Sequence, residues 1–228
     1  MRYRCLVLDH DDTVVNSTAA LHYPAFLHSL ATLRPGMKLT LEDYFRYNFD
    51  PGFAPFCEGT LGFTPADMEW QTKNWLRQIA GRVPPAFPGM RELLEGFCAQ
   101  GGELCVISHS VRENILRDYR ENGLPAPRLV FGWEQPPEHR KPNRWPLQEV
   151  LRQLRLRPEE VLVVDDLKPG LQMARACGVD FACAGWAHQI PEIRSFMEWE
   201  SRYYCKTVAD LAPIVRGELP VGKQEEEP

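Results

Sequence analysis

Short runs of apolar residues recur along the chain, and a helical pattern follows most of them. The runs are apolar throughout instead of alternating, which is typical of strands buried on both faces of a parallel sheet. They cover residues 5–8, 104–107, 129–131, 161–164 and 181–183. The helical patterns occupy 90–100, 112–122, 143–154, 171–177 and 208–215. This alternation predicts an α/β fold with a doubly wound, Rossmann-like parallel sheet, and it leaves 195–204 unassigned.

Residues 17–85 interrupt the alternation, because they carry helical patterns and no strand pattern. Thr64 and Pro65 give the clearest helix start, with an N-cap threonine followed by proline at the first helical position. A proline-rich linker closes the segment near residue 85. We therefore predict a core domain formed by 1–16 and 86–228, with 17–85 as an inserted helical domain.

Composition narrows the class of protein. The 228 residues carry a net charge of −5 without a basic stripe, so neither nucleic acid nor an anionic membrane is the expected partner. The seven cysteines include no Cys-x-x-Cys pair, which favours reduced thiols in a cytoplasmic protein. No apolar run approaches the roughly 20 residues of a membrane span, and Asp9 interrupts any signal-peptide core. We expect a monomer or weak homodimer, with a disordered charged tail at 222–228.

Polar side chains follow three of the predicted strands at the points where these strands end. Asp9 and Asp11 follow the first strand, Ser108 the second, and Asp165 and Asp166 the fourth. The carboxyl ends of parallel strands lie at one edge of a sheet, which is where open α/β sheets bind ligands. Carboxylates crowded there repel each other unless a cation is present, and oxygen ligands favour Mg²⁺.

Each of these residues also has a purely structural interpretation. The aspartates after the first strand are typical of a turn or a helix N-cap, and Ser108 is a typical N-cap residue. Asp165 and Asp166 are suited to capping the next helix. Lys141, which precedes a proline, could be an ordinary surface lysine.

Four segments in order resemble the motifs of the haloacid dehalogenase-like hydrolase superfamily. The first, from Asp9 to Ser17, is similar to the family's Asp-x-Asp-Gly-Thr-Leu-x-Asp-Ser. Ile107-Ser108 resembles the second motif, Lys141-Pro142 the third, and Val164-Asp165-Asp166 the fourth. The insert lies where the C1-capped branch, which includes phosphoglycolate phosphatases and β-phosphoglucomutases, has its helical cap. The resemblance therefore implies a core domain with 17–85 as a C1-type cap.

The resemblance also implies a role for each matching residue. Asp9 would attack phosphorus to form an aspartyl-phosphate, and Asp11 would act as the general acid and base. Ser108 and Lys141 would bind the phosphoryl group, with His109 beside them as a substrate-binding residue. The implied ligands of Mg²⁺ are Asp9, the backbone carbonyl of Asp11, and Asp166, with Asp165 as a further candidate.

The sequence departs from the family pattern at several positions, three of which bear on the acidic site. Asp12 stands where glycine is usual, and Asp165 stands where glycine is commoner. Gly170 falls where a second metal-binding aspartate is frequent. These departures leave open which of Asp165 and Asp166 contacts the metal.

The resulting hypothesis is a Mg²⁺-dependent phosphomonoester hydrolase that acts on a small phosphorylated metabolite. Asp11 argues against dehalogenation, in which no oxygen leaving group needs a proton. A phosphomutase of the β-phosphoglucomutase type and a catalytically silent binding protein are the alternatives. Specificity is expected to come from the cap, where the cations Arg34, Lys38, Arg46 and Lys73 are candidates for an anionic group. Its aromatic residues are expected to form the cap core.

Overall fold

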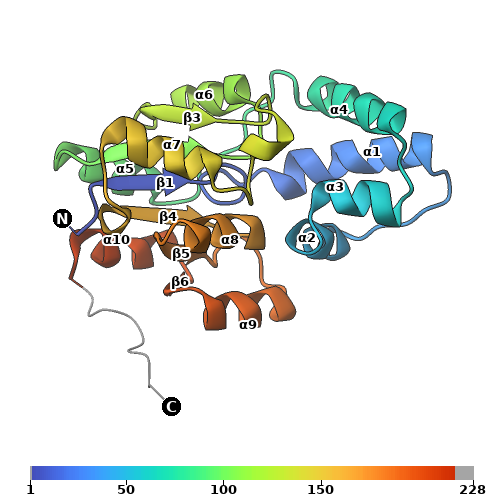
Figure 1. Ribbon diagram of the computed structural model, residues 1–228. Coiled ribbons are helices and arrows are strands. Elements are labelled where there is room, and N and C mark those ends of the chain that lie inside the picture. The colour runs from blue at the N-terminus through green and yellow to red at the C-terminus, as the bar shows by residue number, and fades with distance from the viewer. Residues whose placement is uncertain (1, 219–228) are drawn as a thin grey trace, which may run out of the picture. The chain divides into compact units, whose positions relative to one another are not determined.

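The computed structural model describes residues 2–218 (Figure 1). The predicted disordered tail at 222–228 lies outside these residues. The chain divides into two compact units, one formed by Asn16–Pro85 and the other by the segments before and after it, Met1–Val15 and Ala86–Pro228. The division falls within one residue of the predicted boundaries, and the roles of the two units as cap and core stay a proposal.

The larger unit is built on a six-stranded parallel sheet with the strand order β3-β2-β1-β4-β5-β6. Its strands are β1 (Cys5–Leu8), β2 (Glu103–Ile107), β3 (Leu129–Phe131), β4 (Val161–Asp165), β5 (Asp180–Ala184) and β6 (Tyr203–Cys205). Every residue of β1 and β4 is buried, as expected for the apolar runs at 5–8 and 161–164, and β4 ends on the buried Asp165. The strand order reverses between β1 and β4, because β2 and β3 lie on one side of β1 and β4 to β6 lie on the other. Such a switch point forms the ligand crevice of open α/β sheets. The predicted fold class is confirmed.

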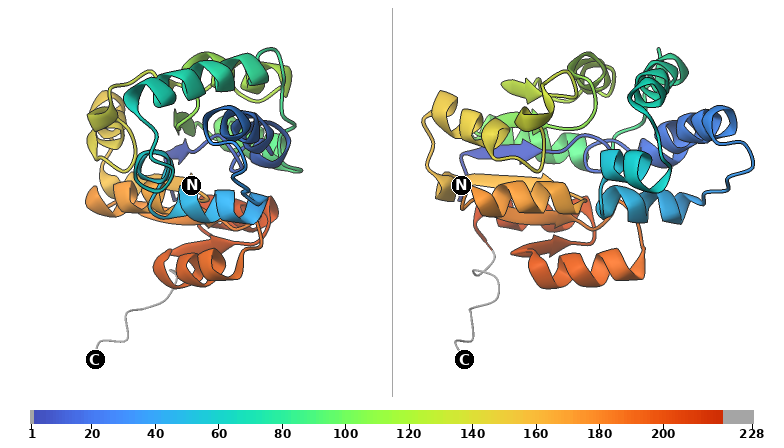
Figure 2. Two further views of the ribbon diagram at one scale, coloured as in Figure 1. Left: turned by 90° about the vertical axis from the view of Figure 1, so that its right-hand side faces the viewer. Right: turned by 45° about the vertical axis from the view of Figure 1, so that its right-hand side comes forward.

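Helices cover both faces of this sheet (Figures 1 and 2). On one face, α5 (Met90–Ala99), α6 (Arg112–Glu121) and α10 (Val208–Arg216) share a core with alternate strand residues such as Leu6 and Val106. On the other, α7 (Trp145–Leu154) packs against β2, and α8 (Lys168–Ala176) packs against β4 and β5. The helix α9 (Pro191–Glu200) lies beside β6.

The elements α9 and β6 occupy the region that the sequence left unassigned. β6 has only three residues and is defined by its pairing with β5, so its own residues carry no recognisable strand pattern. The side chain of Trp199 on α9 is 76% exposed, and an apolar residue on the polar face obscures the helical period. Helix α8 begins at Lys168, three residues before the predicted start at 171. The prediction was late because the first turn of this helix contains Pro169 and Gly170 and no large apolar side chain.

The regular elements of the smaller unit are all helical. Its elements are η1 (Thr18–His22), α1 (Tyr23–Leu33), α2 (Leu41–Phe49), α3 (Phe53–Pro55), η2 (Phe56–Thr60) and α4 (Pro65–Ile79). The predicted start of α4 is confirmed by a capping box, in which the Asp67 amide donates to Thr64 Oγ1 and the Thr64 amide donates to the Asp67 carboxylate.

Aromatic residues form the core of this unit, as predicted. Phe26, Tyr44 and Phe56 are buried together, and Phe53 packs against them.

Most of the candidate cations already form ion pairs or hydrogen bonds within the unit. Arg34 donates to the carbonyls of Leu61 and Gly62 and pairs with Asp67. Arg46 pairs with Glu42 and Asp43, and Lys73 pairs with Glu69. The charges of these three side chains are therefore partly neutralised locally.

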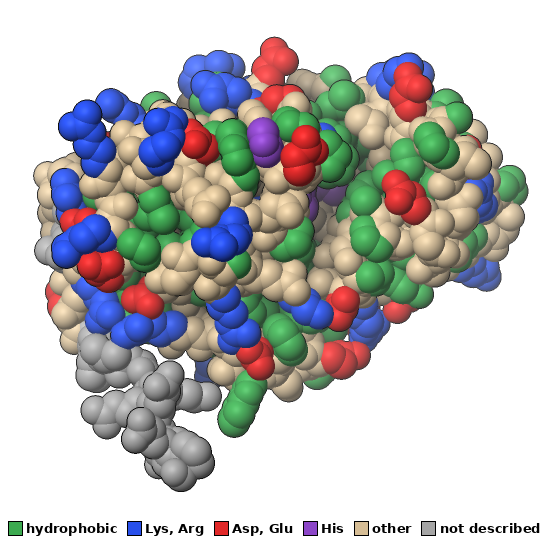
Figure 3. Space-filling model, viewed as in Figure 1, with side chains coloured by type: hydrophobic (Ala, Val, Ile, Leu, Met, Phe, Trp, Pro, Cys, Tyr) green, Lys and Arg blue, Asp and Glu red, His purple; other side chains and the backbone are tan. Residues whose placement is uncertain are grey.

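Basic and acidic side chains are interspersed over the face seen in Figure 3, and no broad patch of one sign covers it. All seven cysteines are free thiols, as predicted. In the described part of the chain, no helix combines the length and the apolar character that a membrane crossing requires.

Candidate active site

The loop that carries Asp9 is fixed by backbone hydrogen bonds at the end of β1. The Asp9 amide donates to the carbonyl of Val164 at 2.9 Å, and the amides of Val14 and Val15 both donate to the carbonyl of His10. Asp12 has φ +57°, which is the left-handed region that glycine adopts freely and that aspartate tolerates better than most residues. This backbone geometry explains why the family usually has glycine there and why aspartate is accepted.

Lys141 lies between two of the predicted site aspartates. Its Nζ is 2.8 Å from Asp9 Oδ1 and 2.5 Å from Asp165 Oδ2, and all three residues are buried. Burial alone lowers the pKa of Lys141, but the carboxylates of Asp165 and Asp9 more than offset it and raise this pKa above its ordinary value. Lys141 is therefore a buried ammonium held by two acids, and its interpretation as a surface lysine is wrong.

Asp165 uses both of its carboxylate oxygens inside the protein. Oδ2 pairs with Lys141, and Oδ1 accepts a hydrogen bond from the Leu167 amide at 2.8 Å. A Cβ atom at position 170 would overlap the Asp165 carboxylate. The two departures from the family pattern are thus linked, because the missing side chain at Gly170 leaves the space that the extra carboxylate of Asp165 fills.

This linkage predicts an unusual response to Gly170→Ala. Alanine normally stabilises a helix interior relative to glycine by roughly 0.5–1 kcal/mol. Here we expect a loss of about 1–3 kcal/mol in the free energy of unfolding, because the new methyl group overpacks against Asp165. Urea unfolding measures the difference. The matched control is Gly96→Ala in α5, where an added Cβ meets nothing within 4 Å. Equal stabilisation of both variants would contradict the packing argument.

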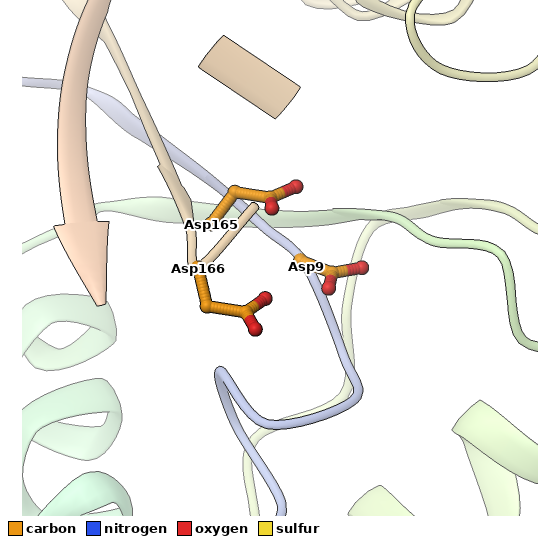
Figure 4. A group of neighbouring side chains, drawn as sticks. All are labelled: Asp9, Asp165 and Asp166. Carbon is orange, nitrogen blue, oxygen red and sulfur yellow. The ribbon is translucent and has the colours of Figure 1, made fainter. Parts of the chain in front are cut away.

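Asp166 completes a group of three buried carboxylates with Asp9 and Asp165. Ligand oxygens of the three lie within 4.8 Å of one another, and in Figure 4 the side chains extend from the ends of β1 and β4 into a shared space. Asp166 also accepts a hydrogen bond from Thr13 Oγ1 at 3.4 Å. Burial, followed by the charges of Asp165 and Asp9, raises the pKa of Asp166 well above its ordinary value. One ammonium does not balance three carboxylates, so this cluster has the charge and the oxygen donors that suit a divalent cation.

Ser108 and His109 follow β2, the strand next to β1. Ser108 Oγ accepts a hydrogen bond from the Ser110 amide at 3.1 Å, which leaves the hydroxyl proton of Ser108 available for another acceptor. The ring nitrogen Nε2 of His109 lies 3.0 Å from the backbone carbonyl of Lys141. Burial, assisted by the Lys141 charge, lowers the pKa of His109 to about 4, so the ring is neutral at pH 7.

The side chain of Asp11 is half-buried and does not join the three-carboxylate group.

Comparison with known proteins identifies the family of the chain. The sequence profile described as haloacid dehalogenase-like hydrolase matches residues 6–184, which is most of the chain. The chain belongs to this family. A relative named pyrophosphatase PpaX, from Halalkalibacterium halodurans, is 24% identical over 219 residues, which cover 94% of this chain and 98% of the relative. The assignment to the hydrolases of this family, with phosphatase relatives, is confirmed.

Solved structures share the fold of this haloacid dehalogenase-like hydrolase. CbbY from Rhodobacter sphaeroides, crystallised in complex with phosphate, has a TM-score of 0.72 at 20% identity. The match covers 92% of this chain and 96% of the CbbY chain. A haloacid dehalogenase-like family protein from Streptococcus pneumoniae has a TM-score of 0.73 at 14% identity, with coverages of 95% and 99%.

Two supports of the Asp9 loop were not predicted from the sequence of this hydrolase. His10 Nε2 lies 3.1 Å from Asp118 Oδ2 on α6, and both side chains are buried. Trp186 Nε1 donates to the carbonyl of Thr13 at 3.1 Å. A signal for the first was present, because Asp118 lies on the same helix face as the buried Ile115 and Tyr119. An acidic residue within an apolar helix face indicates a buried partner.

Proposed function

We propose that the protein is a Mg²⁺-dependent phosphomonoester hydrolase that acts on a small phosphorylated metabolite through an aspartyl-phosphate on Asp9. The observation that carries this proposal is the position of Lys141, whose ammonium bridges Asp9 and Asp165 beside Asp166 at the carboxyl edge of the sheet. Attack of a carboxylate on a phosphate brings two anions together, so positive charge must already be in place.

Asp9 is the proposed nucleophile and Asp11 the general acid and base. A carboxylate oxygen of Asp9 bonds to phosphorus while the bond from phosphorus to the ester oxygen breaks, and Asp11 protonates that oxygen. In the second half-reaction, Asp11 takes a proton from the water that attacks phosphorus, and the oxygen of Asp9 is the leaving group. Asp11 lies two residues from Asp9 and is half-buried, which supports its proposed role in proton transfer.

Ser108 and Lys141 are the proposed phosphoryl-binding residues. Lys141 has three ammonium protons. It donates one to Asp165 and pairs by charge with Asp9, so it keeps donor capacity for a phosphoryl oxygen. Ser108 Oγ accepts from the Ser110 amide, so its own proton can be donated to a phosphoryl oxygen. Together they would place positive charge and a hydrogen-bond donor where negative charge develops.

Mg²⁺ is the proposed cofactor, and the residues present fit it. Asp9 and Asp166 are the proposed carboxylate ligands, with the backbone carbonyl of Asp11, whereas Asp165 is occupied by Lys141 and the Leu167 amide. When bound, the ion would supply the charge that offsets repulsion between Asp9 and the phosphate.

Binding of Mg²⁺ is expected to stabilise the wild-type protein strongly. A ligand that binds only the folded state at 100 times its dissociation constant contributes about 2.7 kcal/mol. We expect Mg²⁺ to raise the melting temperature of the wild type in a thermal shift assay and to leave that of Asp166→Asn nearly unchanged. The control is Asp210→Asn, at an exposed cap of α10, which should respond like the wild type. An equal rise in all three proteins would place the metal elsewhere.

The helical unit at 16–85 is proposed as a C1-type cap that sets substrate specificity, because it is inserted between the first and second motifs. The cytoplasmic location and the monomer or weak homodimer remain predictions from the sequence.

A turnover screen tests the proposed function. Purified wild-type protein is incubated with and without Mg²⁺ on p-nitrophenyl phosphate, phosphorylated sugars, 2-phosphoglycolate and inorganic pyrophosphate, the last because of the names of the relatives. We expect Mg²⁺-dependent release of phosphate from at least one compound. An isomerised sugar phosphate without free phosphate would favour a mutase. No turnover of any compound by a folded, Mg²⁺-binding protein would favour a binding protein.

A further inference from the structure

Lys141 is carried by a long loop and by no strand or long helix. The loop spans residues 132–144, between β3 and α7, and its only regular element is one 3-10 turn at Pro137–His139. Two hydrogen bonds near Lys141 lie within the loop: the Asn143 amide donates to the Arg140 carbonyl, and Arg140 Nε donates to the Gln135 carbonyl. The backbone at Lys141 therefore needs an external support if its ammonium is to remain in one place.

Among the described residues, His109 supplies a hydrogen bond from outside the loop to this backbone. Its Nε2 lies 3.0 Å from the Lys141 carbonyl, and a carbonyl can only accept, so the ring donates from Nε2. A neutral imidazole can do this, and the low pKa of His109 keeps the ring neutral. His109 is adjacent to Ser108 at the end of β2, so the bond ties the lysine loop directly to the sheet.

The ring of His109 is itself held in orientation by the same loop. The ring of Trp133 packs edge to face against it, with centroids 5.8 Å apart and planes at 82°. The guanidinium of Arg140 lies over the Trp133 ring at 4.0 Å. Trp133 is also anchored through its amide, which donates to the Ser110 carbonyl at 2.8 Å. These contacts limit rotation of the imidazole and keep Nε2 directed at the carbonyl of Lys141.

We propose that His109 is a positioning residue that holds Lys141 in place between Asp9 and Asp165. This inference rests on the proposed function, because it assigns His109 to the placement of the phosphoryl-binding lysine. It differs from the expectation that the His109 side chain binds substrate directly. Loss of the bond would let the loop backbone shift, and a misplacement of about 1 Å in an active site costs up to roughly 100-fold in rate.

The test compares two substitutions of similar size, His109→Gln and His109→Met. The glutamine amide can donate to the same carbonyl, whereas the methionine thioether cannot. Using the best substrate of the screen, we expect His109→Met to lower kcat by about 10- to 100-fold with KM within about threefold of the wild type. We expect His109→Gln to recover kcat to within about threefold of the wild type, because the donor is restored.

A second measurement does not depend on turnover. A buried ammonium paired with two carboxylates is expected to give its own ¹⁵N–¹H signal, which Lys141→Met identifies by its loss. We expect this signal in the wild type and in His109→Gln, and we expect it to be broadened or absent in His109→Met. If the wild type turns over no substrate, the proposed function fails, and the ammonium signal still decides the role of His109.

Two results would overturn the inference. One is an unchanged ammonium signal and an unchanged kcat in His109→Met. The other is an equal loss in the Met and Gln variants, since a donor-independent effect would indicate packing alone. If the methionine variant does not fold, His109→Phe provides the same comparison with an aromatic ring that lacks a donor.

Discussion

Asp9→Asn is expected to abolish phosphate release and leave the fold intact. An amide cannot act as the nucleophile, and loss of a nucleophile in a comparable covalent mechanism lowers kcat by about 10⁴-fold or more. The protein should stay folded, because the amide keeps the size of the carboxylate and removes one negative charge from a crowded group. Steady-state turnover with Mg²⁺, together with circular dichroism and a thermal melt, measures both parts.

Asp11→Asn is the matched control, since it changes the other acid of the same loop. We expect it to slow turnover by roughly 10²- to 10⁴-fold, which is the usual contribution of a general acid and base. With p-nitrophenyl phosphate, whose leaving group needs little protonation, formation of the aspartyl-phosphate should be slowed less than its hydrolysis. Retention of substantial turnover by Asp9→Asn would move the chemistry to another residue.

Lys141→Met is expected to reduce both activity and stability. Removing one partner of a buried ion pair costs about 3–5 kcal/mol, because the remaining charge is left buried without compensation. We expect a loss of about 3 kcal/mol in urea unfolding without Mg²⁺, and a fall of about 10²- to 10³-fold in kcat. The raised pKa of Lys141 means that its stabilising contribution is fully present below the pKa of an unfolded lysine, so the loss should be similar from about pH 7 to pH 9.

Two further variants test whether the effect of Lys141→Met comes from its buried ion pairs. Lys206→Met changes an exposed lysine of the same unit and is expected to alter stability by no more than about 0.5 kcal/mol. The double variant Lys141→Met/Asp165→Asn should recover part of the lost stability, because it removes one of the uncompensated carboxylates. It should not recover activity. A Lys141→Met protein as stable as the wild type would show that the buried pair does not contribute to the fold.

The fold and the location of the site could be predicted because both depend on local patterns. Each buried strand is a continuous apolar run, and the polar residues that end these runs lie at one edge of a parallel sheet. Asp9, Asp165 and Asp166 were brought together on that argument, and the structure places them in one group. The place of Lys141 in the site was predicted from the family resemblance alone, because its loop has no regular pattern of its own.

What the sequence did not predict depends on contacts between distant segments. The bond from His109 to the Lys141 carbonyl joins residues 32 positions apart, and the pair of His10 and Asp118 joins residues 108 apart. The reason for Gly170 became clear only when the Asp165 carboxylate was found in the space of its missing side chain. The strand β6 was missed for the same reason, since it is recognised by its partner strand and not by its own residues.

The most direct test of the central claim is detection of the covalent intermediate on Asp9. The wild type and Asp11→Asn are mixed with the best substrate and Mg²⁺, quenched rapidly in acid, digested and examined by mass spectrometry. The account predicts a phosphoryl group on the peptide that contains Asp9, in greater amount in Asp11→Asn and absent from Asp9→Asn. A phosphoryl group on another residue, or none during turnover in either protein, would contradict it.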